Sequence, residues 1–325
     1  MIARVLASLA VSAACIFFAT RNVDWPGLRG ILADARLFPV LLGMALSLIT
    51  YWLRAVRWRV LLSPFQRIPD FTLLRWQVGG LLISNLLPLR LGEFARAYWA
   101  GHKSSLSKST VFATIVVERV MDVGFLAVIA AAVLLWPGGN SGEAFAARKL
   151  IAVLVFLAAG AAAARFLLTR PQGTAVLERF RSSLPEKAGA LLEKFTTGFR
   201  VFRNRREFAK VAVLSPVIWS IDIAILALVS RALGLDLSWR EGAMTMVGLI
   251  LGVMVPAAPG SAGTYEAGGV AALTLMGFDK TLSLSFVLLV HAIQLVYVIA
   301  LGVPILMYEG FSPRALLREA RAERG

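Results

Sequence analysis

The sequence is poor in charge, cysteine and histidine. Of 325 residues only 16% are charged, against about 25% in an average soluble domain, whereas 58% are hydrophobic. The single cysteine, Cys15, has no second cysteine for an intrachain disulfide, and two histidines are too few for a histidine-based metal site. Neither a Gly-x4-Gly-Lys-Ser/Thr phosphate loop nor a His-Glu-x-x-His zinc motif occurs. We therefore expect no ATP hydrolysis, no metal and no cofactor.

So apolar a composition predicts an integral membrane protein. At about 20 residues a crossing, the chain accommodates roughly six to eight spans and leaves no room for a separate soluble domain of about 100 to 200 residues. We expect one all-α membrane domain over residues 1–325. Lys and Arg number 34 against 19 Asp and Glu, a net charge of +15. In so apolar a chain this excess belongs in loops and at helix ends, which favours anionic lipid headgroups over nucleic acid as partners.

Six apolar runs are long enough to predict full transmembrane helices. They cover residues 2–19, 37–53, 110–136, 148–169, 209–233 and 281–308. Two further segments, about 71–100 and 241–277, are apolar but interrupted, which predicts broken or re-entrant helical hairpins. The hairpin interruptions are Pro88 and Gly92 in the first segment and Pro256, Pro259, Gly260 and Gly263 in the second.

Loop charge predicts the orientation, because cytoplasmic loops carry the excess of Lys and Arg. Residues 54–75, residues 170–210 and the tail from Arg314 are basic, whereas the loop at 137–143 has no positive charge. We therefore expect a multi-pass protein of the bacterial inner membrane with both termini cytoplasmic. The first broken segment would then open to the cytoplasm and the second to the outside.

This placement divides the chain into two halves of the same plan, residues 1–136 and 137–325. Each half would have three crossings, so the second would be inverted relative to the first, as in many secondary transporters. Between them, residues 171–208 alternate apolar and basic positions. That segment is either an amphipathic helix on the anionic inner leaflet or a solvated connector.

The first break carries charges that are costly at membrane depth and therefore usually functional. A half-helix beginning near Glu93 could present free N–H groups to an anion, and Arg90 and Arg96 could bind a phosphate. Alternatively, both arginines extend to the interface and Glu93 neutralises one of them. The same segment contains Asn85, Pro88 and Gly92.

The second break places Glu266 after its prolines and glycines, much as Glu93 follows the first break. Both carboxylates could approach the midplane where the halves meet. Because burial disfavours the charged form of a carboxylate, Glu266 could carry a proton. Alternatively, the prolines and glycines only turn the hairpin, and Glu266 forms a hydrogen bond with the backbone.

A third polar cluster, Glu118-Arg119-Val-Met-Asp122, lies inside a predicted span. Arg119 and Asp122 are three residues apart on one helix face and can pair. The pair is either structural, or Arg119 lines an anion path beside Arg90. Further polar candidates are Asp222, His291, Gln294 and Tyr297, with His291 expected to be a packed core histidine.

Four of these stretches resemble the flippase-like transmembrane region of lysylphosphatidylglycerol synthases and their stand-alone relatives. They are Arg54 to Leu62, Asn85 to Arg96, Glu118 to Asp122 and Val255 to Glu266. The resemblance implies lipid translocation between leaflets and, since no aminoacyl-transferase domain follows, argues against aminoacyl transfer. Relatives connected with hopanoid or polyprenyl-linked glycolipids widen the range of lipids. One departure is Pro259-Gly-Ser-Ala-Gly263, where many relatives would have Pro-Gly-Gly-x-Gly.

The sequence thus predicts translocation, without ATP, of an amphipathic, anionic lipid such as a phospholipid, a hopanoid or a polyprenyl-linked lipid. The predicted translocation residues are Asn85, Arg90, Glu93, Arg96, Arg119, Asp122 and Glu266. Two alternatives stay open. One is a membrane-embedded enzyme acting on a lipid-phosphate, with Glu93 and Glu266 as acid and base. The other is a non-catalytic partner that docks a lipid synthase through residues 171–208.

Overall fold

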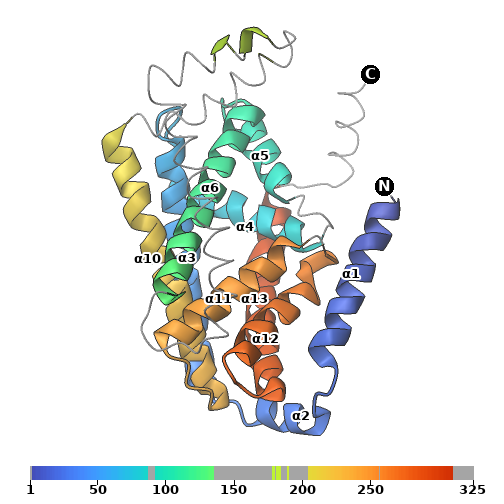
Figure 1. Cartoon of the computed structure of the whole chain (residues 1–325). Helices are drawn as coiled ribbons and strands as arrows, with labels where there is room; N and C mark the ends of the chain where they lie inside the picture. The colour runs from blue at the N-terminus through green and yellow to red at the C-terminus, as the bar shows by residue number, and fades with distance from the viewer. Residues whose placement is uncertain are drawn as a thin grey trace.

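The computed structural model describes a bundle of helices (Figure 1). The described residues are 2–86, 92–134, 178–179, 181–183, 189, 204–255 and 257–309. Within these ranges every regular element is helical and there is no strand. The predicted all-α class is therefore confirmed.

The elements fall into two series along the chain. The first comprises α1 (Ile2–Thr20), α2 (Trp25–Ala33), α3 (Leu37–Leu62), α4 (Asp70–Leu86), α5 (Gly92–Lys103) and α6 (Lys108–Leu134). The second comprises α10 (Arg205–Ser230), η3 (Arg231–Leu233), α11 (Trp239–Met254), η4 (Pro259–Ser261), α12 (Thr264–Leu275) and α13 (Lys280–Tyr308). Polar side chains fix several starts: Asn204 caps α10, Ser238 and Glu241 form a capping box on α11, and Asp279 caps α13.

Three described helices are long and apolar enough to cross a membrane: Leu37–Leu62, Arg206–Leu233 and Lys280–Tyr308. They agree with three of the six predicted spans. The apolar part of α1, Ser8–Thr20, is shorter, and α6 has the predicted length but carries several charges. The predicted span 148–169, the loop 137–143 and most of the connector 171–208 lie outside the described residues.

The prediction for the end of α3 was wrong. The sequence placed residues 54–75 in a basic loop after a span ending at 53, but the helix continues to Leu62. Arg54 and Arg57 therefore lie on α3, where each has an acidic partner. The helix continues because apolar residues persist between the arginines, and Trp58 on the same face is fully buried.

The first broken hairpin is present, with α4 ending at Leu86 and α5 beginning at Gly92. Its two helices touch through glycine, since a Cβ on Gly92 would collide with the carbonyl oxygen of Gly80. Its open end is fixed to the end of α13, where Glu309 binds Arg75 of α4 at 3.0 Å and Lys103 of α5 at 2.7 Å. The hairpin thus enters and leaves at one end of the molecule. Pro88 and Arg90 fall outside the described residues.

The second hairpin consists of α11 and α12 joined through η4. Its helices also meet at glycines, because a Cβ on Gly248 would reach 2.5 Å from the carbonyl oxygen of Gly268. Pro259 begins η4, and Gly260 and Gly263 have φ of 70° and 88°, which only glycine adopts without strain. Pro256 lies outside the described residues.

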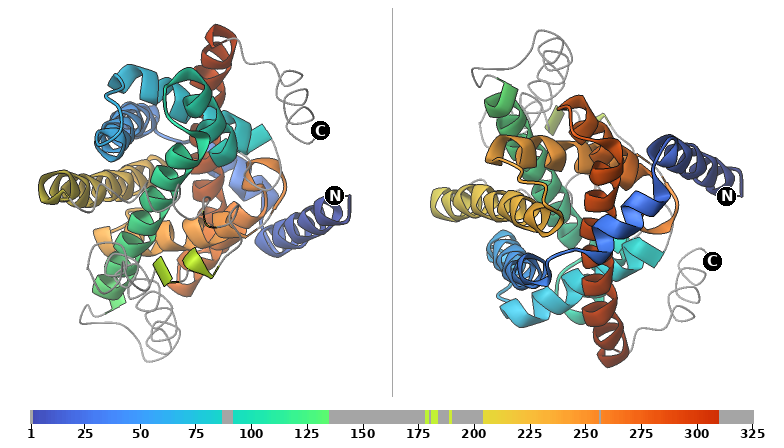
Figure 2. Two further views of the ribbon diagram at one scale, coloured as in Figure 1. Left: turned by 90° about the horizontal axis from the view of Figure 1, so that it is seen from above. Right: turned by 90° about the horizontal axis from the view of Figure 1, so that it is seen from below.

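The two series pack against one another throughout the bundle. Helices α3 and α10 lie antiparallel, with Gly43 near Val229 at one level and Arg57 bonded to Ser215 at another. Between the series, α4 also packs on α13 and α11 on α6, whereas α5 on α6 and α12 on α13 are contacts within one series. The hairpin tips meet, since Gly260 of η4 faces Asn85 near the end of α4. Helix α1 stands at the edge in both views of Figure 2 and packs on α12.

Candidate functional site

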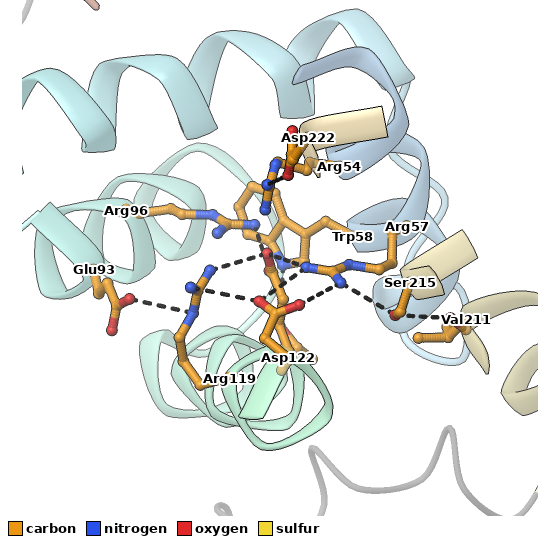
Figure 3. A network of polar contacts seen from close by, with 12 residues as sticks. Arg54, Arg57, Trp58, Glu93, Arg96, Arg119, Asp122, Val211, Ser215 and Asp222 are labelled. Atoms are coloured by element: carbon orange, nitrogen blue, oxygen red, sulfur yellow. Dashed lines mark hydrogen bonds and ion pairs between the residues drawn. The ribbon is translucent and has the colours of Figure 1, made fainter. Parts of the chain in front are cut away.

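Six charged side chains gather between α3, α5 and α6 (Figure 3). They are three arginines and three carboxylates, which we call the charge cluster: Arg57, Arg96, Arg119, Glu93, Glu118 and Asp122. Arginine and carboxylate numbers are equal, so the charge cluster is neutral as a whole. A neighbouring pair, Arg54 with Asp222, links α3 to α10.

Glu118 is the centre of the charge cluster. Its side chain is 1% exposed and accepts hydrogen bonds from three guanidinium groups. The donors are Arg57 at 3.0 Å, Arg96 at 3.1 Å and Arg119 at 3.2 Å. Since an isolated buried charge is very costly, Glu118 depends on the buried Arg57 and Arg96, and the half-exposed Arg119 adds a third bond.

Arg57 has no exposed surface and connects three helices. Its guanidinium donates to both carboxylate oxygens of Asp122 at 2.6 and 3.2 Å, and to the Ser215 hydroxyl of α10 at 3.1 Å. A bidentate arginine–carboxylate pair is among the stronger charge-assisted contacts and fixes geometry as well as charge. Arg57 therefore holds α3, α6 and α10 together around the cluster.

Arg96 is also buried and is positioned by an aromatic ring. Its guanidinium carbon lies 3.6 Å from the centroid of the Trp58 ring, in the geometry of a cation–π contact. The Trp58 indole N–H donates to the Thr114 hydroxyl on α6 at 3.2 Å, which fixes the ring. Trp58 of α3 therefore packs against Arg96 of α5 and joins the arginine-bearing faces of these two helices.

The charge cluster reaches the surface at Arg119 and Glu93. Their side chains are 46% and 41% exposed, and Arg119 Nε lies 3.3 Å from Glu93 Oε1. Arg119 also lies 3.5 Å from Asp122, so the pairing predicted from their spacing is confirmed. The cluster thus has a buried part and an accessible ion pair at its rim.

The second hairpin has a smaller polar site of its own. Glu266, near the start of α12, contacts His291 Nδ1 of α13 at 2.5 Å and accepts from the backbone N–H of Gly263 at 2.7 Å. The His291 ring packs on Tyr265 with centroids 4.4 Å apart. Glu266 therefore makes the backbone hydrogen bond that the sequence left as one of two alternatives, together with a buried bond to histidine.

The structure brings four of the predicted translocation residues together in the charge cluster: Glu93, Arg96, Arg119 and Asp122. Asn85 lies instead at the contact between the hairpin tips, and Glu266 lies in the second hairpin. Arg90 is outside the described residues. The prediction omitted Arg57, which was assigned to a loop. Arg54, Arg57 and the apolar Leu61 are spaced by three and four residues, as on one face of a helix. This spacing could have shown that the helix continues through Arg57.

This architecture defines a class: a multi-pass helical membrane protein with charged groups paired in its interior. Residues 5–302 match the model of the family described as "Lysylphosphatidylglycerol synthase TM region". The chain belongs to that family, which confirms the resemblance seen in its motifs.

Two archaeal proteins are similar along most of the chain. Glycosyltransferase AglD of Haloferax volcanii is 24% identical over 301 residues, covering 81% of this chain and 47% of AglD. The chain therefore spans about half the length of AglD. A UPF0104 membrane protein of Methanothermobacter thermautotrophicus is 25% identical over 290 residues, covering 84% of this chain and 86% of that protein. No solved structure matches.

Proposed function

We propose that this protein moves an amphipathic, anionic lipid between the leaflets of a membrane, without ATP. The observation that carries the proposal is the charge cluster, in which three arginines meet inside a membrane protein and one of them, Arg119, is accessible at the rim. Charges in such a place are costly and usually serve a polar substrate. The lipid headgroup would pass along this polar rim while its acyl chains stay in the bilayer.

The paired arrangement of the two series supports alternating access. Contacts of α3, α4, α5 and α6 have counterparts in α10, α11, α12 and α13, because α4 packs on α13 as α11 packs on α6. Helices α3 and α10 are antiparallel, and the hairpins enter from opposite ends to meet at Asn85 and Gly260. We infer that the halves are inverted repeats that rock about the hairpin tips.

Charge distribution supports an orientation. Among the described residues, eight Lys and Arg lie at the end of the molecule where α3 finishes, α10 starts and the first hairpin opens: Arg59, Arg67, Arg75, Lys103, Lys108, Arg205, Arg206 and Lys210. Six lie at the opposite end: Arg21, Arg29, Arg36, Arg231, Arg240 and Lys280. By the positive-inside tendency, the first end would be cytoplasmic, in a bacterial inner membrane with both chain termini inside.

The test is reconstitution in liposomes that contain fluorescent phosphatidylglycerol, phosphatidylcholine or polyprenyl phosphate, with chemical quenching of the outer leaflet. The wild type should make inner-leaflet anionic lipid accessible to the quencher, and Arg119→Ala should slow this at least tenfold. Lys210→Ala, which removes an exposed charge on α10 paired with Glu207, is the matched control and should behave as wild type. Absence of flipping for every lipid, with and without a proton gradient, would reject the proposal.

A second candidate function follows from the name of one relative. AglD is called a glycosyltransferase, which favours a membrane-embedded enzyme acting on a lipid-phosphate. Purified protein incubated with polyprenyl phosphate and nucleotide sugars should then yield a glycosylated lipid, whereas a translocase leaves the lipid chemically unchanged. A role as partner of a lipid synthase would appear as loss of that synthase's activity when the chain is deleted, with flipping by the purified protein absent.

A further inference from the structure

The charge cluster consists of a neutral buried part and a separable rim pair. Arg57 and Arg96 face Glu118 and Asp122, and these four side chains are all at most 8% exposed. Arg119 and Glu93 form the rim, where both are more than a third exposed. In the buried part, two arginines balance two carboxylates. The positive charge of Arg119 is therefore balanced by the negative charge of Glu93.

Arg119 lies deep in the molecule although it is accessible. It follows Lys108, the first residue of α6, by about 16 Å along the helix axis at a rise of about 1.5 Å a residue. An arginine facing only hydrocarbon at such a depth would be costly. Its exposed surface therefore faces water or lipid headgroups, and this places the rim pair where a headgroup could reach it.

We propose that an anionic lipid headgroup binds Arg119 by displacing Glu93, so that Glu93 is an internal competitor for the site. This proposal rests on the proposed function. It adds that Arg119 is the residue that the headgroup contacts, and that Glu93 occupies the site when no lipid is bound. Glu93 holds Arg119 through one contact at 3.3 Å, a weaker geometry than the bidentate Arg57–Asp122 pair. Exposed ion pairs of this kind contribute little and exchange readily.

The charge balance indicates which headgroups fit. A phosphodiester carries one negative charge and replaces the Glu93 carboxylate without changing the net charge around Arg119. A phosphomonoester with two negative charges would add a surplus beside Glu118 and Asp122, which lie 3.2 and 3.5 Å from Arg119. We infer a preference for lipids with a singly charged phosphodiester over phosphomonoester lipids.

The experiment is a binding titration in neutral detergent micelles, with fluorescent phosphatidylglycerol as the probe and phosphatidylcholine and phosphatidic acid as comparators. The wild type should prefer phosphatidylglycerol. Glu93→Gln should bind it about two to ten times more tightly, because the competitor is removed while the shape is kept. Arg119→Gln should lose the preference for phosphatidylglycerol over the comparator lipids. In the double variant of Glu93→Gln and Arg119→Gln, the tighter binding caused by Glu93→Gln should disappear. Glu207→Gln, which removes a carboxylate on α10 that pairs with Lys210, is the control and should match wild type.

Weaker or unchanged binding by Glu93→Gln would overturn the proposal, as would a gain that persists without Arg119. Displacement of the lipid by an equal concentration of glycerophosphoglycerol would also overturn it, because the site would then belong to a water-soluble phosphodiester. Binding is measured without translocation, so a protein that binds as expected but does not flip lipid contradicts the proposed function alone.

Discussion

The two broken hairpins share a backbone plan and differ in their chemistry. Each turns at a break, brings its two helices together at glycines and has a glutamate in the first turn of its second helix. In the first hairpin Glu93 meets Arg119 at an accessible rim, whereas in the second Glu266 meets His291 in a buried site. A guanidinium stays charged at every pH that proteins encounter, but an imidazole need not be charged. Under the proposed function, the first hairpin therefore contributes to the anion site, whereas the contacts of the second stabilise the fold.

The largest expected effect lies in the buried part of the charge cluster. Arg57→Ala leaves Asp122 without its bidentate partner and removes one of the cations around Glu118. Breaking a buried ion pair in this way should cost about 3 to 5 kcal/mol of unfolding free energy. Unfolding in detergent micelles by titration with dodecyl sulfate measures it.

The control for that prediction is on the same helix. Arg59 is 47% exposed and pairs with Asp70, so Arg59→Ala should change stability by at most about 1 kcal/mol. Equal losses for the two arginines would show that burial of the charge cluster does not govern the stability of the first hairpin.

The glycine contacts should matter in both hairpins alike. An added methyl at Gly92 meets the backbone of Gly80 and Ser84, and one at Gly268 meets the backbone of Gly248. Because backbone atoms cannot move aside as a flexible side chain can, Gly92→Ala and Gly268→Ala should each destabilise by about 1 to 3 kcal/mol.

Gly124→Ala provides the comparison, since a Cβ on Gly124 of α6 has nothing within 4 Å. Alanine is the better helix former, so this variant should be as stable as wild type or up to about 1 kcal/mol more stable. Thermal unfolding in micelles measures all three. A large loss of stability for only one of Gly92→Ala and Gly268→Ala would show that the two hairpins do not share this close helix contact.

The two glutamate partners should differ in their contribution to stability. His291→Ala leaves the Glu266 carboxylate buried with one partner fewer, which should cost about 1 to 3 kcal/mol. Arg119→Ala removes a half-exposed side chain whose partners retain water or other arginines, so its cost should be about 0 to 1 kcal/mol. Flipping should show the reverse order, with Arg119→Ala the more severe. The same order in both measurements would remove the functional distinction between the hairpins.

Much of the arrangement of the two hairpins could be predicted from the sequence. Proline and glycine inside apolar segments predicted both breaks, and the placement of Glu93 and Glu266 after them is as expected. The partners were harder to predict. Arg57 reaches Asp122 and Ser215 across 65 and 158 residues of sequence, and no local spacing encodes such a contact. His291 likewise becomes a partner of Glu266 only when α13 packs on α12.

The turn of the second hairpin carries the smallest expected effect. Ser261 stands where the resemblance led us to expect glycine, and its φ is 57°, in the left-handed region that disfavours residues with a Cβ. Ser261→Gly should relieve this strain and raise the unfolding free energy by up to about 1 kcal/mol, after the greater freedom of glycine in the unfolded chain is subtracted. Ser261→Ala keeps the Cβ and should gain nothing. Equal gains in unfolding free energy for both variants would show that the effect comes from loss of the hydroxyl. Backbone strain at Ser261 would then not distinguish this turn from the first break.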